Sequence, residues 1–288
     1  MSQSNQAPRP SADPGTLLPR SASLALWARA TSPDAPVRPA VRAVVGDDEP
    51  HAVSGPPADA LGVTDLEHLL EAWAGRVVAS AALFPGPGDA MGVPAEVSAD
   101  AVEAEECVLV TLRPSGGRAA AEQGDDGGAD LEHWALVPDV QEFGSEWEPG
   151  HLVVWRTARV ADWSYRTLGT VGSLADAERA LVKGLRDATA ALVSLDVPRW
   201  REDAGEAIAN LRQTVDLRHL LPPGDDPRRS QVFQSAARLR AIVDLAGVDD
   251  GGAVNLWQAD QRSTALREID RVARRAMAAA TVVLPGAR

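Results

Sequence analysis

The feature that most constrains this fold is the apolar periodicity of the C-terminal part of the chain. From Ser173 to about residue 281, apolar residues recur at spacings of three and four, which is the repeat of an amphipathic helix. Breaks at LDVP, before DDPRRS and at GVDDGGAVN divide this stretch into four helices with short connections. Because short connections favour antiparallel neighbours, residues 173–288 are predicted to form a four-helix, bundle-like half with a long C-terminal helical hairpin.

The period changes in residues 21–172, which we interpret as an α/β region. Short apolar runs such as CVLVTL are typical of strands, and about four are predicted, at residues 76–84, 107–112, 133–138 and 151–160. Helices are predicted at residues 21–30, 39–45, 64–75 and 98–106. Residues 1–20, rich in Pro, Ser and Ala, are predicted to be a disordered arm. The fold class is therefore α+β, with a small mixed β-sheet region followed by the helical half.

The stretch GVDDGGAVN, residues 247–255, combines two carboxylates with three glycines between two predicted helices. Gly247 is placed to end one helix, and Asn255 with Gln258 forms a capping box for the next. The acids do not alternate as they do in a calcium-binding loop. We therefore expect a polar turn here.

The charge of the chain is negative and unevenly distributed. The formal net charge is −13, and residues 46–150 carry 22 acids against three Arg, whereas residues 199–288 carry 14 Arg against 12 acids. An acidic surface over the α/β region would repel polyanions and attract cationic partners. The composition therefore disfavours nucleic-acid binding. Of the 28 basic residues only Lys183 is Lys, which indicates a GC-rich genome.

Other features of the composition bear on the compartment. The single Cys107 excludes an intramolecular disulfide. The N-terminal residues lack the basic and apolar regions of a secretory signal, and no apolar stretch is long enough to span a bilayer. A cytoplasmic protein without membrane contact is expected.

Motifs for catalysis and cofactor binding are weak. The glycine loop FPGPGDAMG follows a strand, but its spacing is not that of a dinucleotide-binding loop, so a plain turn is favoured. DLEH occurs twice, and on a helix Asp65 and His68 would share a face, yet further metal ligands are lacking. Cys107 begins an apolar strand and is interpreted as a core residue. No cofactor or metal is predicted.

Tryptophan and arginine suggest a contact surface. The chain has eight Trp, several of which lie near Arg in the sequence, and Arg267, Arg271 and Arg274 repeat on one face of the last helix. Such residues can line a ligand or partner surface. The predicted contact residues are Trp147, Trp163, Arg156, Arg159, Arg267, Arg271 and Arg274.

Three segments, RLRAIVDLAGVDDGGAVN, GDDEPHAV and SASLALWARA, resemble an uncharacterised family of proteins from GC-rich bacteria. The resemblance covers most of residues 21–282. It implies no catalytic residues, because the family has no assigned activity. The chain departs from the family at Pro36 and Pro39, where members tend to have a helix poor in Pro.

The leading functional hypothesis is a non-enzymatic cytosolic protein. It would act by contact with another protein or with a second copy of itself, or it would bind a small ligand. One alternative is an enzyme whose acid–base site combines carboxylates with His51, His68 or His133. A second is an accessory nucleic-acid binder that uses the C-terminal Arg stripe.

Overall fold

The computed structural model describes residues 18–115, 131–145, 148–194, 221–224, 226–247 and 256–284. The predicted arm lies outside these ranges except for its last three residues. Residues 248–255 of the stretch GVDDGGAVN also lie outside these ranges, so the interpretation of this stretch as a turn stays a prediction.

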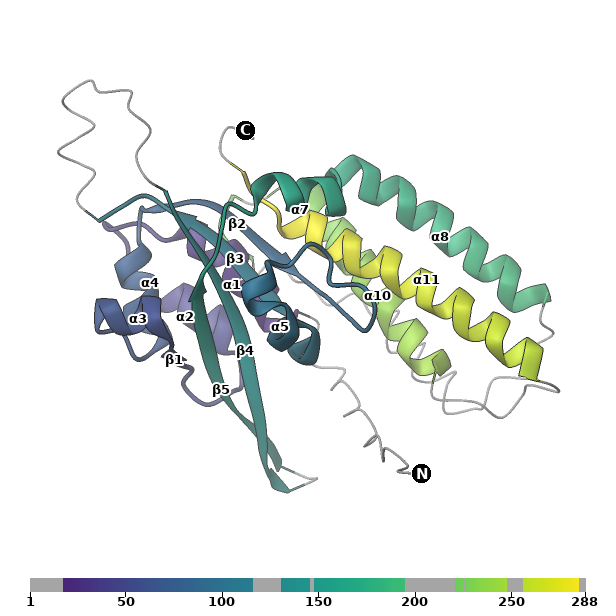
Figure 1. The fold of residues 1–288 in the computed structure, drawn as a ribbon, viewed down its shortest axis with the longest axis horizontal. Coiled ribbons are helices and arrows are strands. Elements are labelled where there is room, and N and C mark those ends of the chain that lie inside the picture. The colour runs from purple at the N-terminus through teal and green to yellow at the C-terminus, as the bar shows by residue number, and fades with distance from the viewer. Residues whose placement is uncertain are drawn as a thin grey trace.

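A five-stranded mixed sheet forms the centre of the N-terminal part (Figure 1). Its order is β1-β5-β4-β3-β2, and all neighbours are antiparallel except β1 and β5, which are parallel. The strands are β1 (Ala52–Ser54), β2 (Val77–Leu83), β3 (Cys107–Leu112), β4 (Glu132–Ser145) and β5 (Glu148–Arg159). The four predicted strands are confirmed, whereas β1 was missed and β4 and β5 are longer than predicted.

Short helices accompany the sheet. They are α1 (Arg20–Ala30), α2 (Arg38–Val45), α3 (Pro56–Leu61), α4 (Leu66–Trp73), the 3₁₀ turn η1 (Ala95–Val97), α5 (Ser98–Ala104) and α7 (Ser164–Val171). Helix α1 packs on β2 and β3, and α5 contacts β4. The four helices predicted in this part are confirmed. Helix α4 is capped by Asp65, whose side chain accepts a hydrogen bond from the backbone N–H of His68.

Three long helices lie in the described ranges of the C-terminal part. They are α8 (Leu174–Ser194), α10 (Pro227–Gly247) and α11 (Leu256–Thr281), and α11 packs against both of the others (Figure 1). Side-chain caps begin two of these helices: Ser173 and Asp176 bond reciprocally at α8, and Asp226 caps α10. The fourth predicted helix, residues 197–215, lies outside the described residues, so a four-helix arrangement stays a prediction.

The C-terminal part is joined to the sheet rather than separate from it. After α11 ends, Val283 exchanges two backbone hydrogen bonds with Ser80 at the outer edge of β2. The hydroxyl of Thr281 accepts a hydrogen bond from the backbone N–H of Ala82 at 2.9 Å. These contacts place the end of α11 on the sheet edge.

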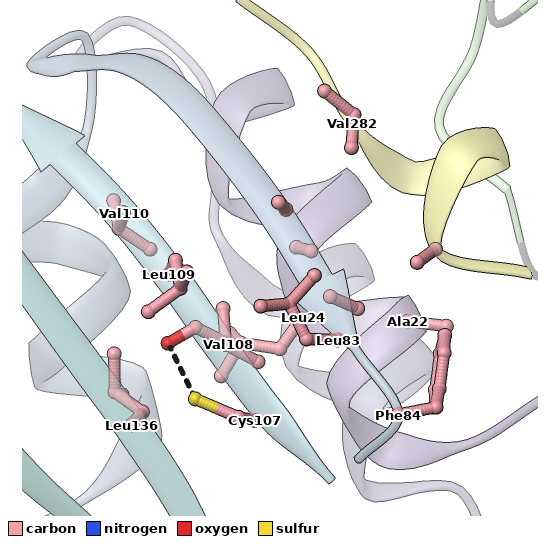
Figure 2. Packing of buried hydrophobic residues seen from close by; sticks show 14 of the residues in the cluster. Ala22, Leu24, Leu83, Phe84, Cys107, Val108, Leu109, Val110, Leu136 and Val282 are labelled. Carbon is pink, nitrogen blue, oxygen red and sulfur yellow. Dashed lines mark hydrogen bonds between the residues drawn. The ribbon is translucent and has the colours of Figure 1, made fainter. Parts of the chain in front are cut away.

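The core lies between the sheet and the helices. Figure 2 shows Val108, Leu109 and Val110 along β3, with Leu24 of α1 near Val108, and all four side chains are fully buried. No helix in the described ranges combines the length and the apolar character that crossing a bilayer requires.

Candidate functional site

A cluster of polar side chains in the N-terminal part surrounds Asp48. Its carboxylate accepts hydrogen bonds from Nε and Nη2 of Arg20, at 2.6 and 2.8 Å, and contacts Nε2 of His51 at 3.1 Å. Nδ1 of His151 lies 3.2 Å from the other carboxylate oxygen. Burial disfavours the charged carboxylate, but the hydrogen bonds from His51 and Arg20 outweigh it and hold the pKa of Asp48 well below its usual range.

His51 is fixed by contacts at both ring nitrogens. The indole Nε1 of Trp155 donates to its Nδ1 at 3.1 Å, so that nitrogen must carry the lone pair, and Nε2–H then donates to Asp48. The side chain of His51 is fully buried. With both nitrogens engaged, His51 links β5 to the segment before β1 and has no free nitrogen to accept a proton from a substrate.

The other two histidines of the acid–base hypothesis lie elsewhere. His68 is exposed at the start of α4, where its Nδ1 is 2.6 Å from the Asp65 carboxylate that caps the helix. His133 is on β4 and contacts the Thr111 hydroxyl at 3.0 Å. The three histidines are thus held in separate local contacts. Within the described ranges no group of three or more His, Cys, Asp or Glu residues is arranged to hold a metal ion.

Cys107 is a core residue, as predicted. Its side chain is fully buried on β3, and its thiol contacts the backbone oxygen of Val108 (Figure 2). Burial disfavours the thiolate and raises the pKa of Cys107 to about 12. The thiol is therefore unsuited to act as a nucleophile.

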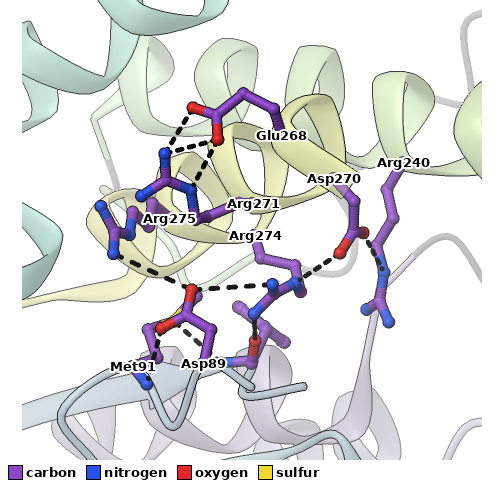
Figure 3. Close-up of polar contacts among 9 residues, drawn as sticks. Asp89, Met91, Arg240, Glu268, Asp270, Arg271, Arg274 and Arg275 are labelled. Carbon is purple, nitrogen blue, oxygen red and sulfur yellow. Dashed lines mark hydrogen bonds and ion pairs between the residues drawn. The ribbon is translucent and has the colours of Figure 1, made fainter. Parts of the chain in front are cut away.

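The glycine loop after β2 is occupied by an arginine of α11. Arg274 has its guanidinium buried against the loop and donates to the backbone oxygen of Phe84 at 2.8 Å (Figure 3). A Cβ added at Gly86 would lie 3.4 Å from Cζ of Arg274, so the guanidinium packs directly against this glycine. The N–H groups of Gly86 and Asp89 bond to each other's carbonyl oxygens. Those amides are therefore not available to a phosphate.

Further ion pairs surround this contact. Asp270 accepts from Nε of Arg274 at 2.7 Å and lies 3.6 Å from Arg240, which also bonds to Glu105 at 2.6 Å. Asp89 stands 3.7 Å from Arg274 and 3.8 Å from Arg275. These pairs link α10 and α11 to the loop after β2 and to the end of α5.

The predicted Arg stripe on α11 is not one continuous cationic surface. Arg267 is exposed and bonds within its own helix, to the Ser263 oxygen and the Thr264 hydroxyl. Arg271 is held by Glu268. Arg274 is buried, so its place in an exposed contact surface was wrong, because the last turns of α11 approach the sheet.

The predicted contact residues of the β region lie in different environments. Trp147 lies outside the described residues. Trp163 is 1% exposed and belongs to the core, so its assignment to a contact surface was wrong. Arg159 is exposed, and its guanidinium lies 5.8 Å from the ring centroid of Trp134, a cation–π contact with a different tryptophan from those predicted. Arg156 is exposed and paired with Asp139.

A two-stranded ribbon extends from the sheet, formed by residues 139–145 of β4 and 148–153 of β5 (Figure 1). The pairing of β3 with β4 ends at Leu136, and β1 pairs with β5 only at residues 154–156. Among the described residues, the ribbon therefore has no third strand on either edge. One backbone group of β5 is already engaged, because the backbone N–H of Glu49 donates a hydrogen bond to the backbone oxygen of His151.

Large apolar side chains are exposed on this ribbon. Val140, Phe143 and Leu152 are 38%, 45% and 46% exposed. The register places Phe143 opposite Gly150 and Leu152 opposite Gln141, so both side chains lie on one face. A Cβ at Gly150 would be 2.5 Å from the Phe143 ring, which shows that the ring covers this glycine. The predicted contact residue Arg156 lies further along the same face.

The comparisons with known proteins identify a family. Residues 21–168 match the model of the N-terminal domain of Rv1486c-like proteins, and residues 175–278 match the model of their C-terminal domain. The chain belongs to the Rv1486c-like family. The expected resemblance to an uncharacterised family is confirmed to this extent, while an origin in GC-rich bacteria stays a prediction. Comparison with curated proteins and with solved structures gave no match.

The two family segments meet between α7 and α8. The ion pairs of Arg240, Arg274 and Arg275 with residues of the N-terminal segment therefore join the two domains that the family models separate. The sequence did not reveal these contacts or the Asp48 cluster, because their members come from elements far apart in the chain. The D-x-x-H spacing of Asp48 and His51 in GDDEPHAV was the one local signal.

Proposed function

We propose that this protein is a non-enzymatic interaction module that binds a basic, partly apolar segment of another protein through the ribbon. The observation that carries the proposal is the exposure of Val140, Phe143 and Leu152 on two strands whose outer edges lack a neighbouring strand. Phe143 and Leu152 share one face of the ribbon, whereas Val140, which pairs with Val153, lies on the other face. Exposed apolar groups on a projecting element favour a partner interface.

The backbone of the ribbon supports this mode of binding. An unpaired strand edge presents N–H and C=O groups to which an extended segment can add as a further strand. The adjacent side chains then supply specificity. Pro149 lacks an N–H on β5, so the edge of β4 that faces away from β5 offers the more regular set of donors.

The charge of the ribbon determines which partner fits. Between residues 139 and 154 the sequence contains four acids, Asp139, Glu142, Glu146 and Glu148, and no Lys or Arg. A second copy of the ribbon would bring like charges together, whereas a basic segment would be attracted. We therefore favour a cationic partner over self-association. The location that fits this proposal is the cytoplasm.

The other two hypotheses receive less support. An acid–base enzyme would need histidines that converge, whereas His51, His68 and His133 are held in separate contacts. A nucleic-acid binder would need a free cationic face, whereas Arg271 is paired and Arg274 is buried.

Affinity purification of the tagged protein from its own host tests the proposal when it is run on matched variants. The ribbon variant combines Val140→Thr, Phe143→Thr and Leu152→Thr, which retain strand propensity and remove apolar surface. The control is Tyr165→Ser, which removes an aromatic side chain that is 86% exposed on α7.

We expect a stoichiometric partner with a basic contact segment that is retained by the control, lost by the ribbon variant and weakened by salt. The proposal fails if no stoichiometric partner is recovered, or if the ribbon variant retains the partner as well as the wild type does. A thermal denaturation curve of each variant establishes that a loss of binding is not a loss of folding.

A further inference from the structure

A cleft opens where the two family segments meet, at a site separate from the ribbon. Its volume is about 270 Å³, and it lies between the end of α7, the first turns of α8 and the C-terminal half of α11. Ligand sites occur preferentially at domain junctions, and this volume is near the lower limit of their usual size. The cleft therefore suits a small molecule.

Small side chains leave this space open. Gly169, Gly172, Ala177, Ala180 and Ala276 line the cleft together with Val171 and Val272. A Cβ added at Gly169 would meet no atom within 4 Å. The walls formed by these residues offer an apolar surface rather than hydrogen bonds.

Two arginines of α11 line the same cleft. Arg271 and Arg275 are four residues apart and share one face of the helix. Arg271 is occupied, because Glu268 accepts hydrogen bonds from its Nε and Nη2 (Figure 3). The hydrogen bond with Glu268 raises the pKa of Arg271.

Arg275 differs from Arg271 in that its guanidinium makes no hydrogen bond to any residue that the structure describes. Its closest acid is Asp89 at 3.8 Å, and that carboxylate is shared with Arg274 (Figure 3). The side chain of Arg275 is 35% exposed. It can therefore offer N–H donors to an anion that enters the cleft.

The acids that line the cleft do not cancel this charge. Glu268 is bound to Arg271, and Asp176 accepts from the backbone N–H and hydroxyl of Ser173 and from Arg179. The pKa of Asp176 is lowered, first by its hydrogen bonds from Ser173. The N-terminus of α8, which carries the positive end of the helix dipole, begins at this wall.

We propose that this cleft binds a small organic carboxylate with a short apolar body, whose carboxylate accepts hydrogen bonds from Arg275. The apolar walls bury the body of the ligand, and the guanidinium fork matches the two carboxylate oxygens. This inference concerns a different site from the ribbon and does not depend on it.

Titration of the full chain with hexanoate, followed by ¹H–¹⁵N NMR, tests the proposal. Hexanol carries the same apolar body without the charge, and inorganic phosphate carries charge without the body. Hexanoate is expected to shift the resonances of Gly169, Gly172 and the Arg275 side chain in a saturable way, and the other two probes are not.

Three variants complete the test. Arg275→Gln is expected to weaken hexanoate binding by about tenfold or more, the usual effect of losing a hydrogen bond to a charged group. Ala180→Leu is expected to abolish binding by filling the cleft. Arg267→Gln, an exposed arginine of the same helix that does not line the cleft, is expected to bind as the wild type does.

The proposal is overturned if hexanoate causes no saturable shifts, or if hexanol or phosphate produces the same shifts as hexanoate. It is also overturned if Arg275→Gln, shown to be folded by its spectrum, binds hexanoate as tightly as Arg267→Gln does.

Discussion

The indole N–H of Trp155 donates a hydrogen bond to Nδ1 of His51 in the interior, 3.1 Å away. This contact specifies the neutral Nε2–H tautomer of His51, which in turn donates to Asp48. Nitrogen NMR of the histidine rings at neutral pH should show a protonated Nε2 and an unprotonated Nδ1 for His51. The opposite tautomer, or an imidazolium, would contradict this description.

Removing the same donor should destabilise the protein. Trp155→Phe leaves Nδ1 of His51 buried without a partner, and we expect the free energy of unfolding to fall by about 1–3 kcal/mol. Urea denaturation measures the change. The control is Trp163→Phe, which truncates a buried tryptophan whose indole N–H has no hydrogen-bond partner among the described residues and therefore reports the packing loss alone. An equal loss in both variants would show that lost packing, not the orphaned nitrogen, dominates.

Acid should weaken the Asp48 cluster. The pKa of Asp48 is lower in the folded protein than the ordinary value of 3.8, so its ionised form contributes stability above that value. That stability is lost as the pH falls below about 5 towards the folded pKa. Denaturation midpoints measured from pH 6 to pH 3 should fall more steeply for the wild type than for Asp48→Asn, while exposed Asp34→Asn follows the wild type. Equal slopes for wild type and Asp48→Asn would contradict this.

The buried arginine of α11 should contribute strongly to stability. Arg274→Met removes the donor to the Phe84 oxygen and leaves Asp270 without its closest partner, so we expect a loss of about 3–5 kcal/mol. Arg267→Met, on the exposed face of the same helix, should change stability by less than about 0.5 kcal/mol. Chemical denaturation of the two variants side by side provides the measurement, and similar values for both would contradict the buried contact.

Cys107 should resist modification in the folded protein. Its thiol is fully buried, and its pKa of about 12 leaves almost no thiolate at neutral pH. Mass spectrometry should therefore detect little alkylation by iodoacetamide under native conditions and complete alkylation in denaturant. Rapid alkylation of the native protein would indicate an accessible thiol and contradict the assignment of Cys107 to the core.

Local patterns predicted much of this fold. The four main strands and the helices with a 3.6-residue period were found because each pattern lies within one continuous segment. Strand β1 was missed because it is three residues long and is defined by its distant partner β5. The predicted strands at 133–138 and 151–160 leave residues 139–150 as a connection, yet Gly144 and Pro149 lie opposite each other inside the ribbon, where Gly144 adopts φ +92°.

The polar contacts were harder to predict from the sequence. Helical period places Arg267, Arg271 and Arg274 on one stripe, and it carries no information on where that helix approaches the sheet. The approach occurs near Arg274, which is buried, while Arg267 stays exposed. The partners of Asp48 likewise come from α1 and β5, which only the fold brings together.

The exposed ribbon is the basis of the proposed function, and amide hydrogen exchange tests it most directly. Exchange is measured on the protein alone and on the protein saturated with the partner recovered by affinity purification. The proposal predicts slower exchange in residues 139–145 and 148–153 when the partner is bound, with little change in α8. Protection confined to α8 or to the cleft, with the ribbon unchanged, would contradict it.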